Sequence, residues 1–342
     1  DSAEHYWKSI LRNSKNPDNV IYQYINLLLE NKKPLEVVRL LDEYKGKIEE
    51  SYDFHTSYAK ANLFLKSFEK SMISIQSARK IKPGSTDLDY LEAEALFLND
   101  EDEKSKNKIF EILQNNPRYE LAYILHSKIL REAGKSNEAL KIINNGLEKC
   151  SNSKGLQIEK IKNLKATGEV SNGLMLASEL SQRFPNDIEV LKILANLYHD
   201  IEDFQAAEVV ARKSLHLQSN QPDMHLLLGK VAKHQGQLDQ ALNHFSKAAI
   251  SIVESVDPWL EIGDIYQDQQ ETEKALESYR EAYSRNDKDY RAFYKTGLLL
   301  RDLKDYQGSE KMLKIASSLS PKDTNIRRQL AGVIALNLVH SS

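Results

Sequence analysis

Apolar and small residues recur along the chain in two groups, and each group has the spacing of one helix face. Counted from Val256 as position 1, the first group occupies positions 4, 7, 8 and 11 (Trp259, Ile262, Gly263 and Tyr266). The second group occupies positions 20, 24 and 27 (Ala275, Tyr279 and Ala282). Residues three and four apart share one face of a helix. The pattern therefore predicts two helices that pack against each other as a hairpin.

The hairpin pattern repeats every 34 residues, since it starts again at Tyr290 (290 − 256 = 34). Fixed periods of this length are typical of repeat architectures. The same interval places the repeat starts at Asp18, Tyr52, Thr86, Glu120, Lys154, Ile188, Pro222, Val256 and Tyr290. The window at Lys154 is the weakest, because Gln157 and Lys160 fill apolar positions, although its register holds. We predict nine tandem repeats over residues 18–323.

Small and helix-breaking residues mark the joints of the predicted hairpins. Small residues at positions 8 and 20 let the paired helices approach closely, and the bulky residue at position 24 fills the remaining space. Position 15 is glycine in three repeats, where a residue in the left-handed region would end the first helix. These glycines are Gly134, Gly168 and Gly236. Proline at position 32 stops the second helix in four repeats, at Pro83, Pro117, Pro185 and Pro321.

This arrangement of apolar, small and proline positions resembles the tetratricopeptide repeat (TPR) family over essentially the whole chain. The resemblance implies an all-α fold, a right-handed superhelical solenoid of helix-turn-helix repeats with a concave groove lined mainly by the first helices. Half-a-tetratricopeptide and armadillo-like arrays share the architecture, but their repeat lengths or aromatic signatures fit less well. A solenoid has one continuous core, because each repeat packs only on its neighbours.

The register also predicts what lies at the two ends. One period before Asp18, Ala3, Trp7 and Ile10 fall at positions 20, 24 and 27, so residues 1–17 read as an orphaned second helix. We therefore expect a fragment or processed form of a longer protein. Residues 324–342 are expected to form a capping helix. The cytoplasm is the expected location of the chain as it stands, and an anchored or exported form would follow from a signal in a preceding segment.

Composition and motifs give no sign of catalysis, a metal site or a membrane span. The net charge of −3 and the pI near 6.4 argue against a generic nucleic-acid binder. A single cysteine, Cys150, can form no internal disulfide, and no apolar run approaches the ~20 residues of a membrane span. The sequence has no phosphate-binding glycine loop, C-x-x-C pair or H-E-x-x-H helix. His216, His225, His234 and His244 are nine or ten residues apart, unlike a helical metal site. We predict a non-enzymatic protein without cofactor or metal.

The groove offers the candidate binding residues. The resemblance implies that positions 2, 5, 9 and 12 of each first helix face the concave surface. In repeats 4 to 7 these positions hold the residues that we call the basic stripe: Lys128, Arg131, Lys162, Lys165, Lys192, Asn196, His199, Lys230 and Lys233. Repeat 8 is acidic instead, with Asp257, Glu261, Asp264 and Asp268. The stripe predicts an extended peptide ligand that is acidic in its middle and oriented by the change of sign. Solvated surface lysines are the alternative interpretation.

A more specific family site is incomplete in this sequence. Some family members hold the carboxylate at the end of a chaperone tail with a set of Lys, Asn and Arg residues in three consecutive repeats. Lys192 and Asn196 match the first pair, but Leu227, Asp257 and Glu261 occupy the other places. An acidic third repeat would repel a carboxylate, so we predict no chaperone-tail receptor.

Three functional hypotheses remain open at this point. The first is a non-catalytic scaffold that binds a protein or peptide segment as an assembly or adaptor factor. The second is the targeting arm of a larger enzyme, such as a glycosyltransferase or peptidase, whose catalytic domain precedes Asp1. The third is RNA binding, for which aromatic residues should interleave with the cations. Tyr22, Tyr90 and Tyr294 lie outside repeats 4 to 7, which disfavours this third hypothesis.

Overall fold

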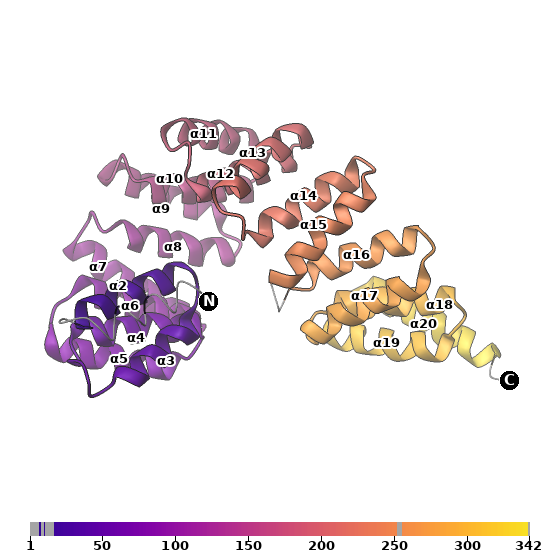
Figure 1. The fold of residues 1–342 in the computed structure, drawn as a ribbon, viewed down its shortest axis with the longest axis horizontal. Helices are drawn as coiled ribbons and strands as arrows, with labels where there is room; N and C mark the ends of the chain where they lie inside the picture. The colour runs from indigo at the N-terminus through magenta and orange to yellow at the C-terminus, as the bar shows by residue number, and fades with distance from the viewer. Residues whose placement is uncertain (1–6, 8–9, 11–16, 252–254, 341–342) are drawn as a thin grey trace. The chain divides into compact units, whose positions relative to one another are not determined.

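The computed structural model describes residues 7, 10, 17–251 and 255–340, and every regular element within them is a helix (Figure 1). The chain divides into two compact units, residues 1–173 and residues 174–342, and each is considered by itself. The expectation of an all-α fold built from paired helices is confirmed.

Helices of the first unit alternate between first and second members of a pair. The first helices are α2 (Pro17–Glu30), α4 (Tyr52–Phe64), α6 (Thr86–Leu98), α8 (Glu120–Glu132) and α10 (Lys154–Ala166). The second helices are α3 (Pro34–Tyr44), α5 (Phe68–Ile81), α7 (Asp102–Asn115) and α9 (Ser136–Lys149). The boundary between the units falls within α11 (Val170–Arg183).

Helices of the second unit follow the same alternation. Its first helices are α12 (Ile188–Asp200), α14 (Pro222–His234), α16 (Asp257–Asp268) and α18 (Tyr290–Asp302). Its second helices are α13 (Phe204–Leu217), α15 (Leu238–Ser251), α17 (Thr272–Arg285) and α19 (Tyr306–Leu319), and α20 (Thr324–His340) follows. The proposed division into nine repeats rests on these starts, which keep the 34-residue interval apart from single-residue offsets at α2 and α16.

One backbone conformation turns the chain between the two helices of every pair. Position 15 has a positive φ, between 54° and 85°, in all nine pairs, as predicted for Gly134, Gly168 and Gly236. The other six are not glycine: Lys32, Lys66, Asp100, Glu202, Gln270 and Lys304. The next residue, at position 16, donates its N–H to the carbonyl of position 11, as Lys135 does to Leu130 at 2.8 Å. This is the six-to-one bond of a Schellman motif, which satisfies a carbonyl at the helix end.

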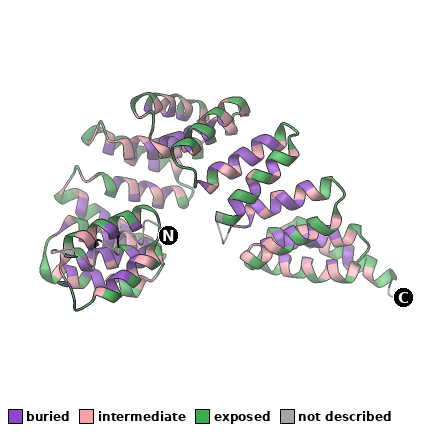
Figure 2. Cartoon of the chain, in the orientation of Figure 1, coloured by how far each residue is buried: buried purple, intermediate pink, exposed green. Residues whose placement is uncertain are grey.

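Neighbouring pairs stack through the same set of contacts in both units. A second helix packs against the first helix that follows it, as α5 does on α6 and α17 on α18. First helices also contact the next first helix, as α4 does on α6 and α12 on α14. Buried residues accordingly lie along the helix sides that face neighbouring helices (Figure 2). The first helices of adjacent pairs therefore share one surface within each unit.

The closest approach within a pair joins positions 8 and 24. An ideal Cβ on Gly263 would lie 2.3 Å from Cε1 of Tyr279, and one on Gly229 would lie 2.4 Å from Cε1 of Phe245. The Tyr279 ring is fully buried, and its hydroxyl donates to Asp264 at 2.7 Å. The prediction that a bulky residue at position 24 fills the space over a small one is confirmed for these pairs.

The two ends differ in how much of them the structure describes. Most of the orphaned helix predicted at the N-terminus lies outside the described residues, although Trp7 and Ile10 are helical. The Trp7 ring stacks on Tyr24 with centroids 5.4 Å apart. At the other end, α20 packs on α18 and α19 and buries Ile326 and Val333. None of the described helices is both long and apolar enough to cross a membrane.

We expect Gly263→Ala to destabilise the second unit by about 1–3 kcal/mol, the usual cost of an overpacked core. Tyr279 cannot give way cheaply, because its ring is buried and its hydroxyl is held. Chemical denaturation followed by circular dichroism would measure the change. Gly332→Ala on α20 is the matched control, because a Cβ there meets nothing within 4 Å. It should be neutral or stabilising by up to about 1 kcal/mol. Equal effects of the two substitutions would contradict the packing argument.

Candidate ligand-binding cavity

A cavity of about 610 Å³ lies on the first helices α4, α6 and α8 of the first unit. We call it the first-helix cavity. Its wall includes positions 2, 5 and 9 of these helices: Asp53, Thr56 and Lys60, then Asp87, Tyr90 and Glu94, then Leu121 and Lys128. Positions 2, 5 and 9 share one helix face, and the stacking of α4, α6 and α8 brings the three faces together. The volume falls within the range of roughly 300–1,000 Å³ that is typical of ligand pockets.

Three tyrosines form the aromatic wall of the cavity. Tyr90 and Tyr119 meet with ring centroids 5.9 Å apart, and Tyr52 lies on α4. The Tyr119 hydroxyl donates to Asp87 Oδ1 at 2.8 Å, and the Tyr52 hydroxyl lies 2.8 Å from Ser85 Oγ. Burial raises the pKa of the Tyr90 and Tyr119 phenols, so both are neutral hydrogen-bonding groups over the physiological range. The rings are thus held in place before any ligand binds.

Apolar side chains at the mouth of the cavity are left open to solvent. Phe64, Leu98 and Leu121 line it and are 55%, 39% and 40% exposed. Leu63 and Leu91 are buried beside them and belong to the core between α4, α5 and α6. Exposed apolar groups around a concave wall are the usual anchor points for a ligand's apolar side chains.

Charged groups of both signs also line the cavity. Asp53 and Asp87 stand at position 2, whereas Lys60 and Lys128 stand at position 9 and Lys66 follows at the end of α4. Lys128 Nζ lies 5.0 Å from the centroid of the Phe97 ring in a cation–π contact. Within the described part of the chain, Asp53, Asp87, Lys60 and Lys66 form no ion pair.

Glu94 is the one acid among the lysines at position 9. Burial raises the pKa of its carboxyl above the ordinary value, and the nearby Lys128 and Lys60 oppose this shift without cancelling it. The folded protein therefore carries a partly buried carboxyl that ionises less readily than a free one.

Two of the basic-stripe residues in the first unit contact the same carboxylate. Glu159 is buried and pairs with Arg131 through Oε1, and its Oε2 lies 3.6 Å from Lys162 Nζ. Arg131 also donates to Asn163 Oδ1 at 3.4 Å. Lys165 is exposed, and Lys128 lies in the first-helix cavity instead. The structure thus brings Arg131 and Lys162 together and places Lys128 with a different set of residues.

In the second unit, two lysines of the stripe each pair with one carboxylate. Lys192 Nζ lies 2.9 Å from Asp223, and Lys233 Nζ lies 2.9 Å from Glu261. Asn196 donates to the Lys192 carbonyl at 2.7 Å, and the His199 ring meets Phe204 edge-on at 5.6 Å. Lys230 is half-buried, and the pairing of Lys192 and Lys233 with the following first helix was not predicted from the sequence. The role of the stripe in peptide binding stays a prediction.

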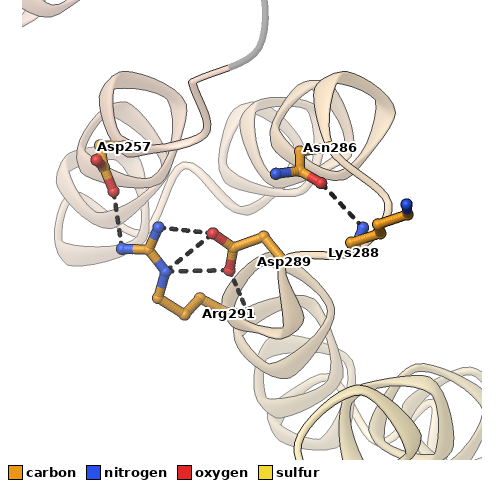
Figure 3. A network of polar contacts seen from close by, with 5 residues as sticks. All are labelled: Asp257, Asn286, Lys288, Asp289 and Arg291. Carbon is orange, nitrogen blue, oxygen red and sulfur yellow. Dashed lines mark hydrogen bonds and ion pairs between the residues drawn. The ribbon is translucent and has the colours of Figure 1, made fainter. Parts of the chain in front are cut away.

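The acidic residues of repeat 8 are likewise paired with cations. Arg291 donates to Asp257 at 2.7 Å and to Asp289 at 2.6 Å, which joins α16 to α18 (Figure 3). Hydrogen bonds to both carboxylates raise the pKa of Arg291 further above its already high value. Asp264 accepts from Lys295 at 2.8 Å. The change of sign seen in the sequence is therefore largely compensated within this unit.

Two of the four clustered histidines meet in the structure. Nδ1 of His225 on α14 lies 3.1 Å from Nδ1 of His244 on α15. Burial lowers the pKa of both rings, that of His244 to about 4, so both are neutral at physiological pH. No group of three metal-ligating side chains occurs among the residues that the structure describes.

Comparison with known proteins identifies the fold family. Residues 260–323 match the sequence profile of the family described as Tetratricopeptide repeat. The chain is a tetratricopeptide-repeat protein. This repeat fold is typical of protein-interaction scaffolds and is rarely itself catalytic. No curated protein matches the sequence.

Solved structures show the same fold as this tetratricopeptide-repeat protein at low identity. The APC/C hetero-tetramer Cut9-Hcn1 matches with a TM-score of 0.59 and 17% identity over 87% of this chain. The human IFIT1 dimer with m7Gppp-AAAA matches with a TM-score of 0.64 and 12% identity. The match covers 94% of this chain and 81% of that chain. A tetratricopeptide repeat protein from Parabacteroides merdae matches with a TM-score of 0.52 and 15% identity. The match covers 84% of this chain and 100% of that chain. The present chain spans 59% of the Cut9-Hcn1 chain.

Most of the cavity residues of this tetratricopeptide-repeat protein were not predicted from the sequence. Lys128 and Tyr90 were named there, whereas Asp53, Asp87 and Phe64 were not. The basic stripe consists mainly of cations in phase, whereas the cavity mixes aromatic, apolar and oppositely charged groups. The available signal was the set of residues at positions 2, 5 and 9 of repeats 2 to 4, examined for size and aromatic character.

We expect Glu94→Gln to stabilise the protein increasingly as the pH rises from about 4 to about 7. A raised folded pKa means that the folded state binds more protons than the unfolded state above the ordinary pKa, so stability falls as pH rises through that window. Glutamine removes this loss. Thermal unfolding midpoints of wild type and variant across pH would measure it. Glu120→Gln, on the exposed start of α8, is the control. A difference that does not change with pH would contradict the interpretation.

Proposed function

We propose that this protein is a non-catalytic interaction scaffold whose first helices bind an extended polypeptide segment, with the first-helix cavity as the main contact. The observation that carries the proposal is the cavity itself on three stacked helices, with an aromatic wall, exposed apolar side chains and charges that form no ion pair within the described residues. A volume of about 610 Å³ suits a few side chains of a peptide.

Protein ligands fit this surface better than nucleic acid. Three carboxyl groups line the cavity beside three lysines, and a basic surface free of acids would suit phosphates better. Cut9 and Hcn1 form a hetero-tetramer, which supports a protein partner for a chain of similar fold. The human IFIT1 structure contains m7Gppp-AAAA, but the net charge of −3 and the mixed cavity favour a polypeptide here. We assign the protein an assembly or adaptor role on these grounds.

An acidic portion of the ligand would contact the basic stripe. In the first unit, Arg131 and Lys162 both lie beside Glu159. Cations gathered on this face would attract acidic residues as the ligand leaves the cavity. In the second unit the one-to-one pairs of Lys192 and Lys233 make the stripe a weaker attractant.

Selection of short random peptides displayed on phage, with the immobilised chain as bait, tests the proposal. We expect wild type to enrich a family of peptides, and the triple variant Phe64→Ser, Leu98→Ser, Leu121→Ser to bind a synthetic member at least about tenfold more weakly. Loss of apolar anchors from a binding surface commonly costs more than about 1 kcal/mol, and 1.4 kcal/mol is about tenfold. Fluorescence anisotropy titration would give the affinities.

The matched control removes apolar groups that are at least as exposed, from the same unit but outside the cavity. Leu35→Ser, Ile73→Ser and Phe110→Ser act at side chains that are 57%, 64% and 63% exposed. This triple variant should bind the peptide as wild type does. The proposal fails if no peptide is enriched, or if the cavity and control variants bind equally well.

Reversal of Lys162, Lys165, Lys192 and Lys230 to Glu tests the stripe separately. We expect the variant to lose the enrichment of acidic residues beside the apolar anchor, with the larger loss of affinity at low salt. Circular dichroism checks the fold, because Lys162 and Lys192 each lie beside a carboxylate in wild type. Unchanged affinity and unchanged peptide composition would remove the stripe from the binding surface.

A further inference from the structure

The two ends of the first-helix cavity carry opposite charges that form no ion pair within the described chain. Asp53 and Asp87 stand at one end, and Lys60 and Lys66 stand at the other. All four side chains are exposed and form no ion pair with other described residues. We propose that the cavity selects a bipolar peptide segment, with a cationic side chain at Asp53 and Asp87 and a carboxylate at Lys60 and Lys66. This inference rests on the proposed function, because it specifies the ligand of the same cavity.

Helix geometry keeps these charges from pairing with each other. Asp53 and Lys60 lie seven residues apart on α4 (60 − 53 = 7). At a rise of about 1.5 Å per residue, this separates them by about 10 Å along the helix axis. The separation is too large for a direct ion pair, so the two ends stay distinct.

The same separation sets the spacing of the ligand's charges. An extended peptide rises about 3.3 Å per residue, so charged side chains about two to four residues apart would reach both ends. Side chains on one face of an extended peptide alternate with those on the other. A basic and an acidic residue four positions apart on one face therefore leave one position between them for an apolar residue on that face. Phe64, Leu98 and Leu121 lie exposed in the same cavity to receive it.

The acidic end is built to hold a cation. The Tyr119 hydroxyl donates to Oδ1 of Asp87 and leaves Oδ2 without a described partner. Asp53 lies on α4 beside Tyr52, and the Tyr90 and Tyr119 rings are held against each other. Carboxylates next to aromatic faces favour Lys and Arg side chains by charge and by cation–π attraction.

The basic end is suited to a carboxylate despite the presence of Glu94. Burial raises the pKa of Glu94, which weakens its competition for the neighbouring lysines. Lys128 is engaged over the Phe97 ring, whereas Lys60 and Lys66 are exposed and unpaired within the described residues. These two lysines are the cations available to a ligand.

Elsewhere in the protein, comparable groups are used to join neighbouring helices. In the second unit, Lys233 pairs with Glu261 and Lys295 pairs with Asp264, each across two adjacent first helices. Position 9 of repeat 8 is thus already engaged. The charges of the first-helix cavity differ from these because they have no such structural partner.

Parallel selections of the same displayed peptide library on three forms of the full chain test the inference. One variant is Asp53→Asn, Asp87→Asn, and the other is Lys60→Gln, Lys66→Gln. Wild type should enrich peptides with a basic and an acidic residue about four positions apart and an apolar residue midway between them. The first variant should lose the basic preference alone, and the second the acidic preference alone. A synthetic wild-type binder should bind each variant about three- to tenfold more weakly, since exposed charge pairs are individually modest.

The outcomes separate this inference from the proposed function. Peptides that carry charges of one sign only would overturn the bipolar ligand but leave peptide binding intact. The bipolar ligand would also be overturned if both variants enriched the same peptides as wild type and bound them with unchanged affinity. An absence of any enriched peptide on wild type would overturn the proposed function itself.

Discussion

One residue in the left-handed backbone region fixes the geometry of every helical hairpin that the structure describes. Its φ is positive in all nine pairs, yet only three of the nine residues are glycine. A residue with a Cβ costs roughly 1 kcal/mol or more in this conformation. The bond from position 16 to the carbonyl of position 11 helps to offset that cost in each pair. Because the turn never varies, the second helix always leaves the first at the same point.

A constant turn keeps neighbouring repeats in register, and the register decides where polar groups meet. Arg131 with Glu159, Lys233 with Glu261 and Arg301 with Gln329 are all separated by 28 residues. Each contact joins position 12 of a first helix to position 6 of the next first helix or, for Gln329, of α20. Lys192 with Asp223 and Lys295 with Asp264 use a second interval, of 31 residues. The charged surface of the first helices is thus also a set of links between repeats.

The hairpins could be predicted from sequence because their signals are local. Spacing within 34 residues identifies both helices, and Gly134, Gly168 and Gly236 identify three turns. Lys66 and Glu202 give no such signal, since only their neighbours force them into a positive φ. The family profile covers residues 260–323, where Gly263 and Gly297 keep the pattern strongest.

The candidate site was harder to predict because it depends on pairs of helices. Arg131 and Lys233 were included in the basic stripe because of their positions alone. Each pairs with a glutamate at position 6 of the next repeat, which that choice did not consider. Tyr119 joins the cavity from the residue before α8, outside the positions expected to face the groove. Which charges are free and which are paired is a property of two adjacent repeats, and a window of one repeat does not contain it.

The fit between positions 8 and 24 also bears on how such a chain can evolve. Gly263 faces Tyr279 and Gly229 faces Phe245, whereas repeat 5 has the reverse order of size in its sequence, with Ile161 at position 8 and Ala177 at position 24. A first helix from one of these repeats joined to a second helix from another would either collide or leave a void. The whole hairpin is therefore the smallest piece that duplication or recombination can move without loss. A single helix exchanged between repeats would carry only half of a matched pair.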